Sequence, residues 1–314
     1  MTATAINEQE VPTRREMSRR DFLKLGGAGF VGAALLGAAG CGAAGGPSGS
    51  KTLTLGNIGW DEDVALNNIL KILLQDKFGY DVELQLADAG PIYQGVATGD
   101  LDAFMDTWLP YTQKIYWQKF KEEVDKLAPW YKGKATIGLA VPDYVEPTSI
   151  ADLNKYKSEF DGTIVGIEAG AGEMNVVKTK VIPGYNLDYS LQASSTPAML
   201  SELKRAVQAK KPIVVTAWQP HWMFTAYPLR YLADPKGLMG KGEQLSAIVK
   251  KGLQKDKPEA YAMIKAVRLN QKELGTLEIE INKSGSQQGT QNWLKDNQSV
   301  VQPWISAAKK TGKA

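Results

Sequence analysis

The sequence predicts an α/β fold that is organised as two lobes. The chain has 314 residues, of which 43% are hydrophobic and 23% are charged, and this is an ordinary globular balance. The length is sufficient for two lobes of roughly 100–150 residues each. Two successive series of strand and helix patterns are followed by a helical tail, and this order favours two α/β lobes.

The first series of patterns runs from residue 52 to residue 142. Apolar residues between 63 and 79 recur at helical spacing, and Gly79 is a stop signal. Residues 81–87 alternate with period two, as a strand does. The elements expected here are strands at 52–56, 81–87, 101–108 and 135–142, and helices at 63–79 and 91–99.

The second series begins at residue 162. A glycine turn leads into a helix over 170–182, and a helix over 196–211 has Thr196 as its candidate N-cap and Pro197 at its first position. Strands are expected at 162–169 and 212–218, and the region after about residue 240 is expected to be mostly helical. The predicted organisation is a first part of lobe 1 at 52–140, lobe 2 at 141–232, and a hinge return with helical completion of lobe 1 at 233–314.

The N-terminal region has the layout of an export signal. Arg19 and Arg20 precede a short apolar run that ends in small residues before Cys41, the only cysteine of the chain. "SRRDFLK" resembles the twin-arginine export motif, and "GAAGC" resembles a lipobox, although Ala38 stands where leucine is more usual. The run is too short and too rich in glycine for a confident membrane-spanning helix. Plain secretion with a chance cysteine is the alternative.

These features predict a location outside the cytoplasm. Residues 1–40 are interpreted as a twin-arginine lipoprotein signal peptide, and residues 41–51 as a flexible tether. With Cys41 lipidated, the chain is expected on the outer face of the cytoplasmic membrane or in the periplasm. The membrane is then a partner only through the lipid anchor.

Composition and motifs exclude several classes of function. The net charge is only +3, with acids and bases interspersed, so no nucleic-acid partner is expected. One cysteine and one histidine argue against a metal site, and no cofactor is expected. "GAGEMN" fails the GxGxxG pattern at its third glycine, and no hydrolase motif occurs. The chain is therefore not expected to be an enzyme.

Two short stretches could hold charged groups of a ligand. The cluster "WDEDV" at 60–64 could hold a cation, and the other interpretation is a helix N-terminus where carboxylates meet the positive end of the helix dipole. The "GAG" turn at 170–172 places backbone N–H groups at the start of a helix, which suits an anion. An ordinary tight turn is an equally open interpretation of that stretch.

Three tryptophans occupy equivalent places in the predicted fold. Trp60, Trp108 and Trp218 each lie at the C-terminal end of a predicted strand, which is the edge where open α/β sheets bind ligands. Packing is the alternative for each one alone. Trp222, Trp293 and Trp304 are interpreted as core residues. Several indole faces together suit a quaternary ammonium group, which has no N–H to donate and is attracted to electron-rich rings.

Four stretches of the chain together carry a family resemblance. "GWDED", "DTWLPYT", "GIEAGAGEMN" and "TAWQPHWMF" resemble the glycine betaine substrate-binding proteins of ABC transporters, in collinear blocks over roughly 52–310. The resemblance implies a two-lobed, periplasmic-binding-protein-like fold of type II, with a hinge and a ligand cleft between the lobes. It also implies an ABC transporter permease as partner, a betaine as small-molecule ligand, osmoprotectant uptake as function, and a monomer.

The resemblance also assigns roles to residues. Trp60, Trp108 and Trp218 would form the aromatic cage for the quaternary ammonium group. The ligand carboxylate would meet the backbone N–H groups of Gly172 and Glu173. Well-matched members have a histidine that helps to bind the carboxylate where this chain has Gln113, a neutral amide that still donates a hydrogen bond.

Other ligands and functions remain open at this point. Choline or carnitine receptors share the fold, and Asp61 and Asp63 near the first tryptophan are possible cation contacts for such ligands. A sugar-binding receptor could also stack its ligand on tryptophan. An exported hydrolase would have to use His221, the only histidine, which we interpret instead as a residue that hydrogen-bonds locally.

Overall fold

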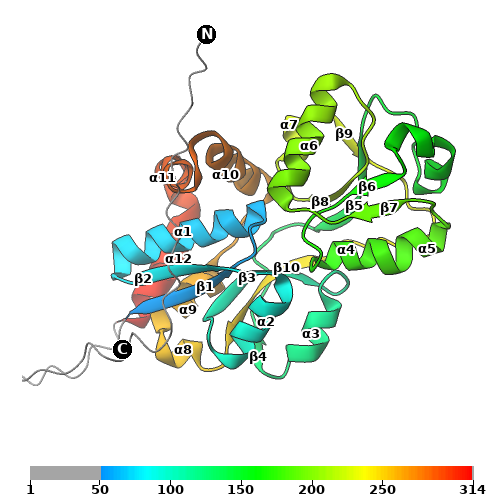
Figure 1. Cartoon of the computed structure of the whole chain (residues 1–314). Coiled ribbons are helices and arrows are strands. Elements are labelled where there is room, and N and C mark those ends of the chain that lie inside the picture. The colour runs from blue at the N-terminus through cyan, green and yellow to red at the C-terminus, as the bar shows by residue number, and fades with distance from the viewer. Residues whose placement is uncertain (1–50, 313–314) are drawn as a thin grey trace, which may run out of the picture. The chain divides into compact units, whose positions relative to one another are not determined.

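The computed structural model describes residues 51–312. The expected signal peptide, Cys41 and the tether up to residue 50 lie outside the described residues. Two five-stranded sheets with helices packed against them confirm the α/β fold (Figure 1). Within the described range, no helix combines the length and the apolar character needed to cross a bilayer.

The sheet of lobe 1 has the order β2-β1-β3-β10-β4. β1 pairs in parallel with β2 and β3, and β10 lies antiparallel between β3 and β4. Parallel strands end at the same edge of a sheet, so the residues that follow β1 and β3 lie close together. The strands are β1 (Thr52–Asn57), β2 (Asp81–Leu86), β3 (Ala103–Leu109), β4 (Val124–Lys126) and β10 (Gln244–Lys250).

The helices of lobe 1 come from both ends of the described chain. Figure 1 shows α10 and α11 beside α1, although they are far apart in sequence. α1 begins directly after Trp60 and ends at Gly79, which takes the left-handed conformation that glycine adopts most easily. The helices are α1 (Asp61–Phe78), α2 (Ala89–Thr98), α3 (Lys114–Phe120), α8 (Leu253–Asp256), α9 (Pro258–Ala266), α10 (Gln271–Ser284), α11 (Ser286–Asp296) and α12 (Gln298–Thr311).

The sheet of lobe 2 has the order β7-β6-β8-β5-β9. β6 pairs in parallel with β7 and β8, and β5 runs antiparallel to β8 and β9. Its strands are β5 (Thr136–Pro142), β6 (Thr163–Val165), β7 (Ser190–Gln192), β8 (Val215–Gln219) and β9 (Leu229–Tyr231). Its helical segments are the 3-10 helix η1 (Ile150–Phe160), α4 (Gly172–Val176), the π-helical segment η2 (Val177–Val181), α5 (Ile182–Tyr185), α6 (Thr196–Ala209) and α7 (Met223–Ala226).

Two chain segments connect the lobes, and they pair with each other. The chain leaves lobe 1 after β4 and returns in β10. Between these points, Ala135 and Glu243 exchange backbone hydrogen bonds of 3.0 and 2.7 Å. The two crossings therefore form a short antiparallel bridge, which is the arrangement of a hinge.

Three details differ from the sequence expectations. β10 lies in the region after residue 240 that was expected to be mostly helical. The expected lobe boundary at residue 140 falls inside β5, so the sheet of lobe 2 begins at Thr136. The N-cap of α6 is Ser195 and not Thr196, because Ser195 Oγ accepts from the backbone N–H of Ala198 while Thr196 is engaged by Glu168.

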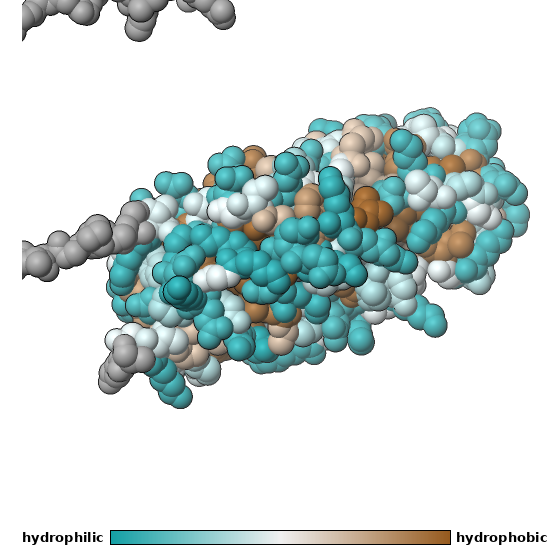
Figure 2. Space-filling view, turned by 90° about the horizontal axis from the view of Figure 1, so that it is seen from below, coloured by the Kyte–Doolittle hydropathy of each residue, from teal (hydrophilic) through white to brown (hydrophobic). Residues whose placement is uncertain are grey.

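The surface of the described residues is mainly polar. Figure 2 shows one face on which hydrophilic side chains predominate and hydrophobic ones form small patches. The large apolar side chains that are most exposed are Leu86, Tyr111, Ile115, Tyr144 and Ile279. Such scattered exposure is normal for a folded domain.

Candidate functional site: a tryptophan-lined cavity

A small cavity lies between the two sheets. The carboxyl ends of β1 and β3 meet it from lobe 1, and the ends of β6 and β8 meet it from lobe 2. Its lining is mostly apolar and aromatic, with two acidic side chains and no basic one: Trp60, Glu62, Trp108, Thr112, Ile137, Ile167, Ala171, Glu173 and Trp218.

The three tryptophans at predicted strand ends come together in this cavity. Trp60 follows β1, Trp108 is the penultimate residue of β3, and Trp218 is the penultimate residue of β8. The ring centroids of Trp60 and Trp218 are 6.4 Å apart with the planes tilted by 49°. All three side chains are almost fully buried. The structure therefore supplies three indole rings around one space.

Each of these indoles donates its N–H to a carboxylate. Trp108 Nε1 donates to Asp106 within β3 at 3.0 Å. Trp60 Nε1 donates across the cleft to Glu168 at 3.2 Å, and Trp218 Nε1 donates across it to Glu62 at 3.0 Å. Each acceptor lies at the N–H edge of its indole, so the ring faces stay available. Each lobe thus donates an indole N–H to a carboxyl group of the other lobe, so the structure is in a closed arrangement.

Two carboxyl groups line the cavity, from opposite lobes. Burial raises the pKa of Glu62 well above its usual value, and neighbouring Asp106 raises it further. Burial also raises the pKa of Glu173, whose carboxylate accepts from the backbone N–H of Ala217 at 3.1 Å. A protonated carboxyl can donate a hydrogen bond, and an ionised one attracts a cation.

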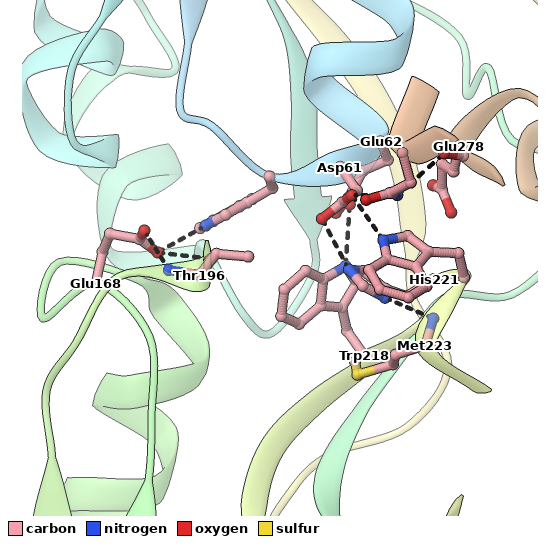
Figure 3. A network of polar contacts seen from close by, with 11 residues as sticks. Asp61, Glu62, Glu168, Thr196, Trp218, His221, Met223 and Glu278 are labelled. Carbon is pink, nitrogen blue, oxygen red and sulfur yellow. Dashed lines mark hydrogen bonds and ion pairs between the residues drawn. The ribbon is translucent and has the colours of Figure 1, made fainter. Parts of the chain in front are cut away.

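The acidic cluster after Trp60 divides between three environments, and Figure 3 shows those of Asp61 and Glu62. Asp61 accepts from Trp222 Nε1 at 2.7 Å and faces His221 Nε2 at 3.0 Å. Asp63 accepts from the backbone N–H of Ile58 at 2.8 Å. Neither of these expected cation contacts lines the cavity, whereas Glu62, which lies between them, does.

Gln113 is buried and lies behind Trp108. Its Oε1 accepts from Tyr93 Oη at 2.8 Å and from the backbone N–H of Trp108 at 3.3 Å, and its Nε2 donates to the carbonyl of Asp106 at 3.0 Å. Its side chain does not line the cavity, and the preceding residue Thr112 does. In this arrangement Gln113 holds the end of β3 in place.

The glycine turn of lobe 2 packs directly on lobe 1. A Cβ at Gly172 would overlap the carbonyl oxygen of Thr112, so only glycine permits this approach. Tyr116 Oη also donates across the cleft to the carbonyl of Gly170 at 2.7 Å. Within residues 51–312, no hydrogen bond is formed by the backbone N–H of Gly172 or Glu173. Both groups lie at the start of α4, beside the cavity.

His221 links the two lobes. Its Nδ1 accepts from the backbone N–H of Met223 at 3.0 Å, and its Nε2 faces Asp61 at 3.0 Å. Its ring lies edge-on to Trp218 and stacks on Trp222, at centroid distances of 4.5 and 5.6 Å. Trp222 is only half-buried, unlike Trp293 and Trp304, which are core residues as expected. Both ring nitrogens of His221 are thus engaged in structure.

Sequence reasoning missed four residues at or beside the cavity: Glu62, Asp106, Thr112 and Glu168. Sequence reasoning selected Asp61 and Asp63 from the acidic cluster, and no spacing rule would have selected Glu62 instead. Asp106 lies two residues before Trp108, on the same face of a strand, and this period-two spacing could have identified it. Glu168 lies just after a strand of lobe 2, where ligand-edge residues are expected.

Comparisons with known proteins agree with this geometry. A family model described as the substrate binding domain of the ABC-type glycine betaine transport system matches residues 51–296. The glycine betaine/carnitine transport binding protein GbuC of Listeria monocytogenes serotype 1/2a (strain 10403S) is 40% identical over 156 residues, or 48% of this chain. That match spans 52% of the relative, about half its length.

Solved structures cover more of the chain. Lactococcal OpuAC, crystallised in a closed-liganded conformation with glycine betaine, has a TM-score of 0.75 and 38% identity, and covers 81% of this chain and 99% of its own. The glycine betaine, L-proline-binding protein ProX from Borrelia burgdorferi has a TM-score of 0.76 and 28% identity, and covers 81% and 96%. The chain therefore belongs to the OpuAC family, the substrate-binding domains of ABC-type glycine betaine transport systems.

Proposed function

We propose that this protein is an extracytoplasmic solute receptor that binds glycine betaine or a related betaine and delivers it to an ABC permease. The observation that carries the proposal is the cavity between the lobes, where three indoles converge with two buried carboxyl groups. A quaternary ammonium group buried there gains about 0.5–2 kcal/mol from each well-placed indole. Three such contacts supply a large part of micromolar affinity, which is about 8 kcal/mol.

The carboxylate of the ligand would be held by the glycine turn. The backbone N–H groups of Gly172 and Glu173 lie beside the cavity and form no hydrogen bond within residues 51–312. A ligand carboxylate supplies the acceptors that both groups need. Gln113 would support this end indirectly, since its amide holds the backbone of Asp106 and Trp108 just before the loop that carries Thr112.

A ligand screen tests the proposal. Calorimetry and tryptophan fluorescence are measured with glycine betaine, proline betaine, carnitine and choline, and with neutral sugars as controls. The proposal expects saturable binding of at least one betaine and none of the sugars. Binding of none of the four quaternary amines would contradict it. Binding of a sugar instead would favour the other kind of receptor.

Choline is the second candidate, and one observation favours it. Two of the cavity-lining side chains are carboxyl groups, and none of the lining residues is basic. A zwitterionic betaine brings a carboxylate into this setting, whereas choline brings only a cation and a hydroxyl. If choline bound tenfold or more tightly than the betaines, choline would be the ligand. The glycine turn would then have no ligand carboxylate to bind.

We further propose a non-enzymatic, exported and lipid-anchored receptor that acts as a monomer. Both ring nitrogens of His221 are engaged, so the only histidine is not a free general base. The anchor at Cys41 rests on the sequence alone. Detergent partitioning of the wild type and of Cys41→Ser tests it: the wild type is expected in the detergent phase and the variant in the aqueous phase.

A further inference from the structure

Two buried carboxyl groups lie behind the tryptophan cage, and each holds one of its indoles. Glu62, at the start of α1, accepts the N–H of Trp218 from lobe 2 at 3.0 Å. Asp106, within β3, accepts the N–H of Trp108 from lobe 1 at 3.0 Å. Both carboxyl side chains are completely buried. Their positions therefore fix the orientation of two cage rings that come from opposite lobes.

The other oxygen of each carboxyl group has no donor among the described residues. Glu62 Oε1 and Asp106 Oδ2 are both inaccessible to water. The two side chains lie within hydrogen-bonding reach of each other. Buried polar atoms in folded proteins are almost always hydrogen-bonded, and an orphaned acceptor is costly. One proton shared between these two oxygens satisfies both at once.

The surroundings favour such a shared proton. Asp61 and Asp63 lie on the same helix as Glu62. Glu278 approaches from α10, beside Asp61 and Glu62 (Figure 3). His221 is turned toward Asp61. Within residues 51–312, no lysine or arginine forms an ion pair with Glu62 or Asp106. Burial first, and nearby acidic groups second, raise the pKa of both carboxyls well above their usual range.

We propose that Glu62 and Asp106 share one proton and act together as positioning residues of the cage. The pair links Trp218 of lobe 2 to Trp108 of lobe 1 through a continuous chain of hydrogen bonds. It also keeps a single negative charge next to the cavity, where it attracts a cation, and avoids the repulsion of two adjacent buried charges. The inference rests on the proposed function in one respect, the positive charge of the ligand.

Amide substitutions test the pair, because an amide copies a protonated carboxyl. In Asp106→Asn the amide oxygen accepts from Trp108 and the amide N–H₂ donates to Glu62, and Glu62→Gln is the mirror image. Each single variant keeps the chain of hydrogen bonds and one negative charge. Affinity for the quaternary amine that binds the wild type best is therefore expected to change by less than about threefold.

The double variant Glu62→Gln/Asp106→Asn keeps the hydrogen bonds and loses the charge. Its affinity is expected to fall by about tenfold or more, a loss far greater than the sum of the two single effects. Asp106→Ala interrupts the series of hydrogen bonds between Trp218 and Trp108 and is expected to weaken binding as well. A tenfold loss in either single amide variant would mean that both charges are needed, and would overturn the shared proton. An affinity equal to that of the wild type in the double variant would also overturn the shared proton.

The ligand-free protein gives an independent measurement. If the wild type binds no quaternary amine, the proposed function fails, and the pair is then judged from urea unfolding between pH 5 and 9. A carboxyl whose pKa is raised in the folded state makes stability fall as pH increases. Asp106→Asn is expected to reduce this fall. An unchanged slope would contradict the shared proton even where the ligand screen succeeds.

Discussion

Trp108 shows how a single residue is prepared for its place in the cavity. Its indole N–H is fixed by Asp106, and its backbone N–H is fixed by Gln113. The ring is nearly completely buried, yet it borders the open space of the cavity. Trp60 and Trp218 are fixed in the same manner by carboxylates of the opposite lobe. Trp108 is therefore held within its own lobe, whereas Trp60 and Trp218 gain their acceptors when the lobes close.

Substitution of Trp108 separates ring electrostatics from packing. Trp108→Leu fills much of the space but has no π face, so affinity for a quaternary amine is expected to fall by at least about tenfold, or roughly 1.4 kcal/mol. Trp108→Phe keeps a face and is expected to lose less. Calorimetry measures both variants, and thermal unfolding confirms that they fold. Equal losses for Leu and Phe would indicate that Trp108 only packs.

Substitution of Gly172 tests the contact between the lobes. Gly172→Ala places a methyl group on the carbonyl of Thr112, so closure is expected to be blocked and affinity to fall by tenfold or more. The fold of each lobe is not affected by this overlap, and the unfolding temperature of the ligand-free protein should change little.

Gly170→Ala is the matched control from the same turn. Its added methyl would lie 3.6 Å from Asp88 Cβ, which is ordinary contact, so binding is expected to stay close to wild type. A ligand affinity that is unchanged in Gly172→Ala would show that the two lobes do not approach this closely in the bound protein.

The sequence identifies the tryptophans better than the acids. A tryptophan at the end of a strand faces the ligand edge of a sheet, and this rule needs only the strand pattern. The direction of a carboxylate in the first turn of α1 depends on the angle at which the chain enters the helix. Asp61, Glu62 and Asp63 therefore look equivalent in sequence, although only Glu62 lines the cavity.

At the scale of elements, the start of α1 and the loop after β6 form the closing contacts. The loop after β6 carries Glu168, which accepts a hydrogen bond from the indole N–H of Trp60 in lobe 1. Glu168 also accepts from the backbone N–H and the hydroxyl of Thr196, at the start of α6. The start of α1 carries Asp61, which accepts a hydrogen bond from the indole N–H of Trp222 in lobe 2 and contacts the ring of His221 from the same lobe. Each lobe thus holds aromatic side chains of the other.

Loss of Glu168 should weaken closure without removing a cavity wall. Glu168→Ala deletes the acceptor of Trp60, and affinity is expected to fall by about three- to tenfold, because hydrogen bonds to charged groups contribute roughly 1.5–3 kcal/mol and this one is partly exposed. Calorimetry measures the affinity, and small-angle scattering with saturating ligand measures compaction. Glu146→Ala, an exposed acid of the same lobe, is the control. Wild-type affinity in Glu168→Ala would contradict this role.

Most helices and strands can be predicted from local sequence patterns, but β10 cannot. Its sequence, "QLSAIVK", is a short apolar run, and such runs do not distinguish a buried strand from a helix. Its place is fixed by pairing with β3 and β4, which lie more than a hundred residues earlier in the chain. The helix expected over 170–182 is likewise divided, because a π-helical segment separates α4 from α5.

At the scale of the whole described chain, buried acids set the response to pH. Burial raises the pKa of five carboxyls well above their usual values: Glu62, Asp63, Asp106, Glu173 and Glu278. Two carboxyls behave in the opposite way. Burial alone would raise the pKa of Asp61 and Asp102, but hydrogen bonds, with His221 and Lys257 respectively, lower it overall.

The balance predicts greatest stability at mildly acidic pH. The five raised carboxyls bind more protons in the folded than in the unfolded protein, so their contribution is lost as pH rises above about 4, where free Asp and Glu ionise. Asp61 and Asp102 contribute stability that is lost as pH falls below that value. Urea unfolding across pH 3–9 measures the curve. Stability that rises steadily toward pH 9 would contradict the burial of protonated acids.

We propose that the cavity recognises a quaternary ammonium cation through indole faces and one buried charge. The most direct measurement compares, by calorimetry, glycine betaine with its tert-butyl isostere, in which carbon replaces the quaternary nitrogen. The two ligands have the same shape and carboxylate, and differ only in the positive charge. The isostere is expected to bind at least about tenfold more weakly, since cation–π attraction is lost. Equal affinities would show that the tryptophans act by burial alone, and would contradict recognition of the positive charge.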